Sequence, residues 1–228
     1  MDCNCHHDQH PNCIERVPIF SSLSREEMLE IAHITSAVTY KKGEMVYMAG
    51  DPGGRLYVLH EGSVKVSRIS VSGKEQVIRV VGPGEFIGEL SLFSPSPLTD
   101  NAETLESTTM CIIDGARLKE LMAKYTSIAF KVLEELSKRL EKAENLIESI
   151  SLGTVEQRLA QALLSLSEGG NEVVLNMRKG DFASQLGMSQ ETLSRKLTAF
   201  QEQGLIELKG HKRIMLLNKD ELENILMS

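Results

Sequence analysis

The sequence has no apolar run approaching the roughly 18 residues that a helix needs to span a bilayer. It also lacks a secretory leader, because the segment from Met1 to Cys13 is polar and rich in cysteine and histidine. We therefore expect the protein to stay in the cytoplasm. Thiols are kept reduced there, so its cysteines indicate metal or redox chemistry more often than structural disulfides.

Signatures of catalysis are missing as well. The chain has no nucleophile elbow and no phosphate-cradling loop, and Gly82-Pro83-Gly84 is typical of a turn. His60 is the only histidine in the range expected to form a barrel interior, so the compact His/Glu metal triad of a cupin-type enzyme is absent from the sequence. We predict that the protein is not an enzyme.

The chain has fewer basic than acidic residues, 25 against 32, and its formal net charge is −7. This balance disfavours a nonspecific nucleic-acid coat, but specific DNA binding depends on where the cations lie. In the last third of the chain the cations are clustered at 178–179, 195–196, 209 and 212–213. A local basic surface on a nearly neutral domain is what these clusters predict.

Length and composition are those of a globular protein with two modest domains and a connector. We expect an α+β fold in four parts: a Cys/His-rich arm (1–16), a β-roll sensor domain (17–115), a dimerisation helix (116–153) and a winged helix-turn-helix DNA-binding domain (154–228). Ser24 is expected to cap a short amphipathic helix near the start of the second part.

Glycines and short β-rich runs alternate through the second part. The runs are 45–48, 56–59, 64–69 and 76–81. Strands at a spacing of roughly ten residues, separated by turn residues, indicate a jelly-roll-like β-barrel of the kind that often encloses a small ligand.

The third part is predicted to be helical from about Ala116 to Ile150. Its apolar residues recur at alternating spacings of three and four, as in a coiled-coil seam: Ala129, Leu133, Leu136, Leu140, Ala143, Ile147 and Ile150. The opposite face is strongly polar, so the narrow apolar stripe favours pairing with a second copy, giving a homodimer. The alternative is a helix that packs on its own barrel.

A helix-turn-helix pattern lies between Lys179 and Gly204. Ala183 permits two helices to cross closely, Gly187 permits the tight turn between them, and Ser189 can cap the second helix. Polar residues suited to DNA contacts share the outer face of that helix: Gln190, Glu191, Ser194, Arg195 and Thr198. The alternative is a solvated face with an intrahelical Glu191–Arg195 pair.

The segments 205–208 and 213–216 read as a hairpin with a basic turn. Lys209, Lys212 and Arg213 surround that turn. This hairpin is predicted to be a wing whose cations contact DNA phosphates, which strengthens binding without reading sequence.

The chain resembles the cyclic-AMP receptor protein/FNR family of bacterial regulators over nearly its whole length. The likeness is carried by Gly84-Glu85-Phe86-Ile87-Gly88-Glu89-Leu90-Ser91-Leu92-Phe93 and by 182–195. Glu191-Thr192-Leu193-Ser194-Arg195 is similar to the recognition helix of the FNR branch. The resemblance implies a dimer in which Glu191, Ser194 and Arg195 read a palindrome with TTGAT-like half-sites, and it implies RNA polymerase as a partner.

The sequence departs from the cyclic-AMP-binding members of that family. These members place an arginine followed by serine or threonine after the Gly-Glu-Leu segment, whereas this chain reads Pro97-Leu98-Thr99-Asp100-Asn101-Ala102. Glu89 matches the family's ribose contact, but Asp100 would repel a phosphate. We predict that cyclic AMP is not bound and that Glu89 serves the structure of the barrel.

Cys3, Cys5, Cys13 and Cys111 are the candidate sensor residues. In the FNR branch three N-terminal cysteines and one in a late strand bind a 4Fe–4S cluster, and four thiolates suit such a cluster. Here the N-terminal pattern is Cys-x-Cys-x7-Cys, in which the first gap is shorter and the second longer than in FNR. Zinc, a disulfide between an N-terminal cysteine and Cys111, and an inert tail with no cofactor remain as alternatives.

Overall fold

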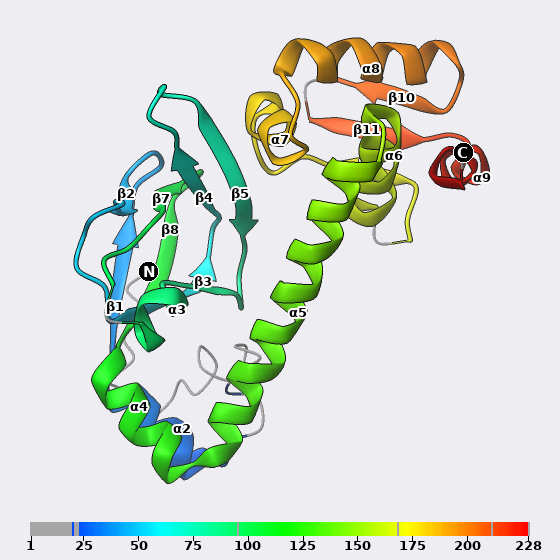
Figure 1. The fold of residues 1–228 in the computed structure, drawn as a ribbon. Coiled ribbons are helices and arrows are strands. Elements are labelled where there is room, and N and C mark those ends of the chain that lie inside the picture. The colour runs from blue at the N-terminus through cyan, green and yellow to red at the C-terminus, as the bar shows by residue number, and fades with distance from the viewer. Residues whose placement is uncertain (1–19, 21–22, 95, 168, 211, 228) are drawn as a thin grey trace. The chain divides into compact units, whose positions relative to one another are not determined.

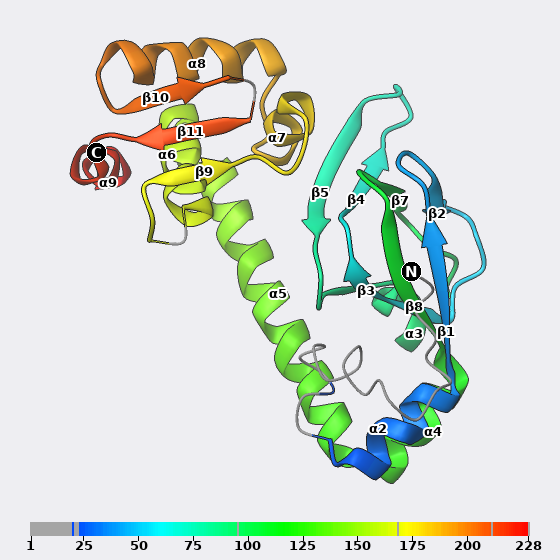
Figure 2. The same cartoon turned by 180° about the vertical axis from the view of Figure 1, so that it is seen from behind.

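A computed structural model describes residue 20 and residues 23–94, 96–167, 169–210 and 212–227. The chain forms two compact units that divide inside the long helix α5 (Thr126–Leu152), after Leu140, and the short stretch Glu75–Val77 groups with the second unit. Figures 1 and 2 show the elements of each unit from opposite sides. None of the helices in the described residues combines the length and apolar character needed to cross a membrane.

The first unit opens with helix α2 (Arg25–His33), and the predicted cap is confirmed. The Oγ of Ser24 accepts a hydrogen bond from the Glu27 N–H at 3.3 Å, and the Ser24 N–H donates to the Glu27 carboxylate at 2.6 Å. This capping box satisfies two backbone donors at once, which fixes where the helix begins.

Two antiparallel four-stranded sheets form the predicted jelly-roll-like domain. The first sheet has the order β1 (Thr35–Tyr40), β8 (Thr108–Asp114), β3 (Arg55–Glu61), β6 (Phe86–Ile87). The second has the order β2 (Met45–Tyr47), β7 (Asn101–Thr104), β4 (Val64–Ile69), β5 (Glu75–Val81). The short helix α3 (Glu89–Phe93) follows β6. The four strands expected from the glycine-punctuated runs are confirmed.

Side chains of β8 alternate between two hydrophobic cores, as the two-residue period of a strand requires. Met110 belongs to a core that joins residues of both sheets. Cys111 and Ile113 belong to the second core, where the first sheet packs against helices. The helical contributions to that core include Ile31 of α2, Leu118 of α4 (Gly115–Lys124) and Ile128 of α5. Helices α2 and α4 lie side by side in both views (Figures 1 and 2).

The helical segment predicted from about Ala116 is interrupted, so the expectation of one continuous helix was wrong. Helix α4 ends at Lys124 and α5 begins at Thr126, because Tyr125 leaves the helical region with φ −121° and ψ 89°. The Tyr125 hydroxyl donates to Glu30 of α2 at 2.9 Å, and the Lys124 ammonium lies 2.7 Å from the same carboxylate. These contacts with Glu30 of α2 are distant in sequence, so the local helix-forming pattern alone did not reveal the break at Tyr125.

The second unit is a helix-turn-helix with a three-stranded sheet. Its helices are α6 (Val155–Leu166), α7 (Lys179–Gln185), α8 (Gln190–Glu202) and α9 (Lys219–Met227). Its sheet has the order β10 (Ile206–Lys209), β11 (Arg213–Leu216), β9 (Glu172–Val174). The predicted reading helices and hairpin are confirmed, whereas β9 and α9 were not anticipated.

Candidate nucleic-acid interface

The turn between α7 and α8 is built by the residues that the sequence singled out. Ala183 is fully buried, which lets α8 cross closely over α7. Gly187 has φ +66°, a left-handed conformation that glycine adopts at little cost. The Oγ of Ser189 accepts the Thr192 N–H at 3.1 Å and so caps α8. These local devices fix the direction in which α8 leaves the turn.

Helix α8 has one buried and one exposed face. Leu193, Leu197 and Phe200 point into the core of the second unit. The predicted DNA-contacting residues are all exposed: Gln190, Glu191, Ser194, Arg195 and Thr198. Glu191 and Arg195 form no ion pair with each other or with another group in the described part of the chain, although the spacing would allow one. Their charged groups are therefore available to another molecule.

An ion pair that the sequence did not predict fixes α8 to α6. The Lys196 ammonium of α8 pairs with the Glu156 carboxylate of α6. The hydrogen bond from Lys196 is the largest of the causes that lower the pKa of Glu156. Because the two residues are 40 positions apart, no local pattern could have revealed the pairing.

The β10–β11 hairpin presents the predicted basic turn. Lys209 lies opposite Arg213 in the strand register, and Gly210 turns the chain with φ +70°. Lys209 lies 3.4 Å from Glu207, and Arg213 lies 3.4 Å from Glu172, while Lys212 is exposed. Exposed ion pairs of this length contribute at most about 1 kcal/mol, so phosphate oxygens can displace them.

The predicted seam on helix α5 has two parts, of which one packs on the core of the first unit and the other is exposed. Leu136 is half-buried and packs on the core that contains Cys111. Leu133, Leu140 and Ile147 recur every seven residues and are exposed by 58%, 60% and 64%. Ala143 is exposed too, Ala129 is half-buried, and the side chain of Ile150 lies outside the described part. Within the described residues of one chain, nothing covers the apolar stripe formed by Leu133, Leu140 and Ile147.

Glu89, at the start of α3, is a buried charge with two cationic partners. Arg79 of β5 donates a hydrogen bond to Glu89 Oε1 at 2.9 Å, and the Arg139 guanidinium of α5 lies 3.0 Å from the same oxygen. Arg139 also donates to the Phe86 carbonyl at 2.9 Å and lies 4.0 Å from the centre of the Phe86 ring. Glu89 therefore serves to join the β-domain to α5.

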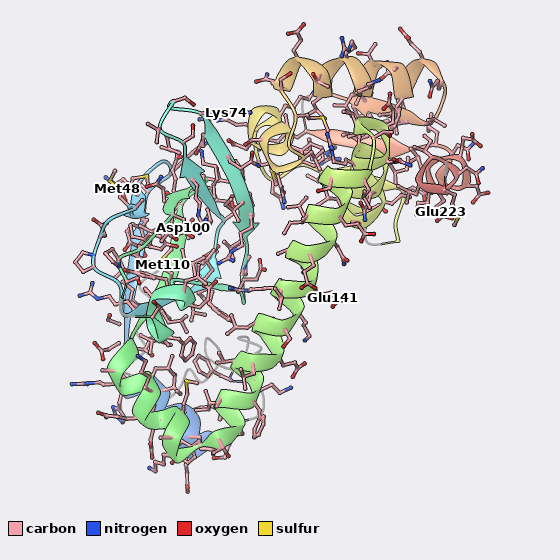
Figure 3. The ribbon with its side chains drawn as sticks, viewed as in Figure 1. Met48, Lys74, Asp100, Met110, Glu141 and Glu223 are labelled. Atoms are coloured by element: carbon pink, nitrogen blue, oxygen red, sulfur yellow. The ribbon has the colours of Figure 1, made fainter. Side chains whose placement is uncertain are left out.

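A cavity of about 260 Å³ lies beside α3 in the first unit. Glu89 and Asp100 both line it, and Figure 3 shows Asp100 among the strands of this unit. The Tyr47 hydroxyl hydrogen bonds to the Asp100 carboxylate. Burial raises the pKa of Asp100 above its ordinary value, and burial followed by the nearby Asp100 charge raises that of Tyr47.

Cys111 lies on the helix-facing side of the first sheet. It is opposite Ala37 of β1 and Val58 of β3, and only 6% of it is exposed. Its core also contains Phe20 and Leu23, which come from the N-terminal end of the described chain. The other candidate ligands, Cys3, Cys5 and Cys13, lie outside the described residues. Among the residues described, no group of three or more His, Cys, Asp and Glu side chains could hold a metal ion.

Comparisons with known proteins agree with this geometry. Residues 37–125 match the cyclic nucleotide-binding domain family, and residues 157–225 match the Crp-like helix-turn-helix domain family. The protein flp of Lacticaseibacillus casei is 30% identical over 215 residues, which cover 93% of this chain and 97% of flp. The chain belongs to the CRP/FNR family of transcription regulators. It is a DNA-binding regulator, and its family is not one of enzymes.

Another relative of this CRP/FNR regulator and one solved structure are similar over most of its length. The CRP-like cAMP-activated global transcriptional regulator of Mycobacterium tuberculosis is 28% identical over 216 residues, covering 92% of this chain and 96% of the relative. The solved structure of FixK2 from Bradyrhizobium japonicum has a TM-score of 0.75 at 23% identity, covering 84% of this chain and 97% of FixK2. The FixK2 likeness supports the fold alone.

Proposed function

We propose that this regulator binds, as a homodimer, a palindrome with TTGAT-like half-sites and responds to oxygen or redox state through its cysteines. The observation that carries the DNA-reading part is the exposed polar face of α8, on which Glu191 and Arg195 have no ion-pair partner among the described residues. Arg195 can bond a guanine bidentately, Glu191 can accept from a cytosine amino group, and Ser194 can contact a base edge. Lys209, Lys212 and Arg213 supply sequence-independent phosphate contacts.

The dimer part rests on the exposed stripe of α5. Leu133, Leu140 and Ile147 follow the seven-residue repeat by which two helices pair. Two copies joined along this stripe would present two α8 helices to half-sites about one helical turn apart. Contact with RNA polymerase belongs to the proposal as the step that follows DNA binding.

The DNA-reading proposal is tested by measuring affinity for a duplex with two TTGAT-like half-sites. We expect tight binding to the palindrome and a large loss when about five base pairs, half a helical turn, are inserted between the half-sites. Leu140→Glu should weaken both dimerisation and binding, whereas the matched change Lys142→Glu on the polar face should not. Equal affinity for the original and the expanded site would contradict the dimeric geometry.

The sensor part rests on the position of Cys111. Its core contains Phe20 and Leu23 from the N-terminal side and Ile128 and Val132 from the start of α5. A bond between the N-terminal arm and Cys111 would therefore act on a core that is shared by Phe20, the first sheet and the start of α5. Making or breaking that bond would bias the packing of α5, and so the affinity for DNA.

Cys3, Cys5, Cys13 and Cys111 are the residues that would hold a 4Fe–4S cluster. The fit rests on Cys111, whose helix-facing core also contains Phe20 and Leu23, the first described residues after the arm in sequence. When bound, the cluster would supply an oxygen-labile link between arm and barrel. Zinc, or a disulfide between the arm and Cys111, would form the same link with different chemistry and is the second candidate.

The deciding measurement is iron, zinc and acid-labile sulfide analysis, with a visible spectrum, on protein purified without oxygen. Iron and sulfide in near-stoichiometric amounts, bleached by air, are expected for the cluster. Cys111→Ala should abolish any difference in DNA affinity between air and anaerobic conditions. Ile113→Val, which removes a methyl group from the same core but no thiol, should preserve it. A wild-type protein whose affinity is the same in both conditions would refute the redox proposal.

A further inference from the structure

Two neighbouring cations of α8 differ in their partners. Arg195 is exposed and has no ion-pair partner among the residues described, whereas the Lys196 ammonium pairs with the Glu156 carboxylate of α6. Successive residues of a helix are rotated by about 100°, so Lys196 lies beside the exposed face that carries Arg195 rather than on it. The lysine is therefore placed at the flank of the face that we propose to read DNA.

The carboxylate side of this pair is held in place by α6. The Thr154 side chain accepts the Gln157 N–H at 3.2 Å, and the Thr154 N–H donates to the Gln157 side chain at 2.7 Å, which fixes where the helix begins. Glu156 lies in the first turn, where the helix dipole favours a carboxylate. Leu159 of α6 and Leu193 of α8 share one core, so the two helices are fixed against each other and the pair exists before DNA arrives.

The pair is less exposed than the ion pairs of the wing. The Lys196 side chain is 26% exposed, compared with 51% for Lys209 and 64% for Arg213. The hydrogen bond from Lys196 is the largest cause of the lowered pKa of Glu156, and the charges of Lys196 and Arg195 lower it further. Glu156 is therefore charged at neutral pH, and a phosphate that took Lys196 from it would meet an uncompensated carboxylate.

We propose that Glu156 is a charge-compensating residue that limits sequence-independent binding to DNA. It cancels the charge of one lysine on α8, so that Lys196 adds no net attraction for the phosphate backbone. The inference rests on the proposed contact between α8 and DNA. It assigns different roles to two adjacent cations, because Arg195 is open to a base whereas Lys196 is neutralised by its own chain. Backbone affinity that carries no sequence information is kept low in this way.

The test is the salt dependence of binding to a duplex that contains no TTGAT-like half-site. Glu156→Gln removes the carboxylate charge and keeps the shape of the side chain, so Lys196 becomes a net cation beside the DNA backbone. Each additional phosphate that is neutralised steepens the slope of log affinity against log salt by about 0.9, and we expect that change for each bound subunit. The affinity relative to wild type should rise roughly threefold per subunit when the salt is lowered from about 200 mM to about 50 mM. An unchanged slope would overturn the proposal.

A neutral pair separates this role from the alternatives. In Glu156→Gln/Lys196→Gln both charges are absent, so the salt slope should match that of the wild type. A double variant that kept the steeper slope would show that Glu156 acts without Lys196. A double variant with a shallower slope than the wild type would show that Lys196 already contacts a phosphate. Either result would contradict the proposal.

The matched control is Glu223→Gln on α9 (Figure 3). It makes the same change in the net charge of the second unit but removes no partner of Lys196, so the slope should stay as in the wild type. An equal steepening in this variant would make the effect one of net charge alone and would count against the proposal.

Failure of this proposal and failure of the proposed function give different results. A folding defect lowers affinity, so the gain expected for Glu156→Gln cannot come from a damaged domain. The slopes are measured on DNA without half-sites and do not depend on a preference for the palindrome. A wild-type protein that bound the TTGAT-like palindrome no better than this duplex would contradict the reading function alone.

Discussion

Two helices of this regulator differ in the burial and the ion pairing of their charged side chains. On α8, Glu191 and Arg195 are exposed, and neither has an ion-pair partner among the residues described. On α3, Glu89 is buried and held by Arg79 and Arg139. The charges of the α8 residues are open to solvent and to another molecule, whereas the α3 residue finds its partners in the chain. Substitutions on α8 should therefore change affinity, and substitutions on α3 should change stability.

Glu89→Gln is expected to have the largest effect on folding. The amide leaves two guanidinium groups together without a compensating charge, and breaking a buried pair costs about 3–5 kcal/mol. Arg79 retains 29% exposure of its side chain, which places the expected loss near the lower end of that range. Calorimetric unfolding of the wild type and the variant measures the loss.

The matched control for this change is Glu135→Gln on the surface of α5. Glu135 is half-buried and pairs at 3.1 Å with the exposed Lys138, which keeps Glu134 as a second partner, so the loss should stay within about 1 kcal/mol. If Glu89→Gln destabilised the protein no more than Glu135→Gln, the Arg79–Glu89–Arg139 cluster would not join the β-domain to α5 as described.

The same contrast explains how much the sequence could predict. The DNA-reading half depends on local rules, such as the Ser189 cap, the Gly187 turn and the spacing of Leu193 and Leu197, so its face was predicted residue by residue. The capping box at Ser24 and the four expected strands of the barrel follow equally local patterns. In these places the determinants lie within a few residues of one another.

The contacts of Glu89, Tyr125 and Asp100 in the first unit depend on partners that are distant in sequence. Arg139 lies 50 residues from Glu89, and on sequence it belongs to the polar face of a helix. The break at Tyr125 depends on Glu30 of another helix. The pairing of Tyr47 with Asp100 is equally distant, so the sequence indicated only that Asp100 would repel phosphate. Distances and burial were needed to identify what these residues contact.

Arg195→Ala should have the second-largest effect, on DNA affinity. Loss of a base-reading arginine costs about 1–3 kcal/mol of binding and relaxes preference at the base pair that it contacts. The free energy of unfolding should change by less than about 0.5 kcal/mol, because the side chain is exposed. Competition binding with operator variants measures the affinity, and Gln203→Ala at the end of α8 is the control. A uniform loss across all operator variants would make Arg195 a phosphate contact.

Asp100→Asn should reveal a pH-dependent effect in the absence of ligand. Burial raises the folded-state pKa of Asp100, so its stabilising contribution is present below the unfolded pKa of about 3.9 and is lost as the pH rises through the folded pKa. The asparagine variant should therefore be more stable than the wild type at pH 7, and the difference should close as the pH approaches about 4. Unfolding curves across that range test this, and a difference independent of pH would contradict the raised pKa.

Lys212→Ala should have the smallest effect on DNA affinity. It separates contacts to DNA phosphates from contacts to bases within the same domain. Lys212 is exposed on the wing, so the variant should fold as well as the wild type. Loss of one phosphate contact should lower the slope of log affinity against log salt by about 0.9 and weaken binding to all operator variants alike. Because this loss is uniform, it separates from the base-selective loss of Arg195→Ala even where the two changes in affinity are similar in size. A Lys212→Ala protein with an unchanged salt dependence would place the wing away from the DNA backbone.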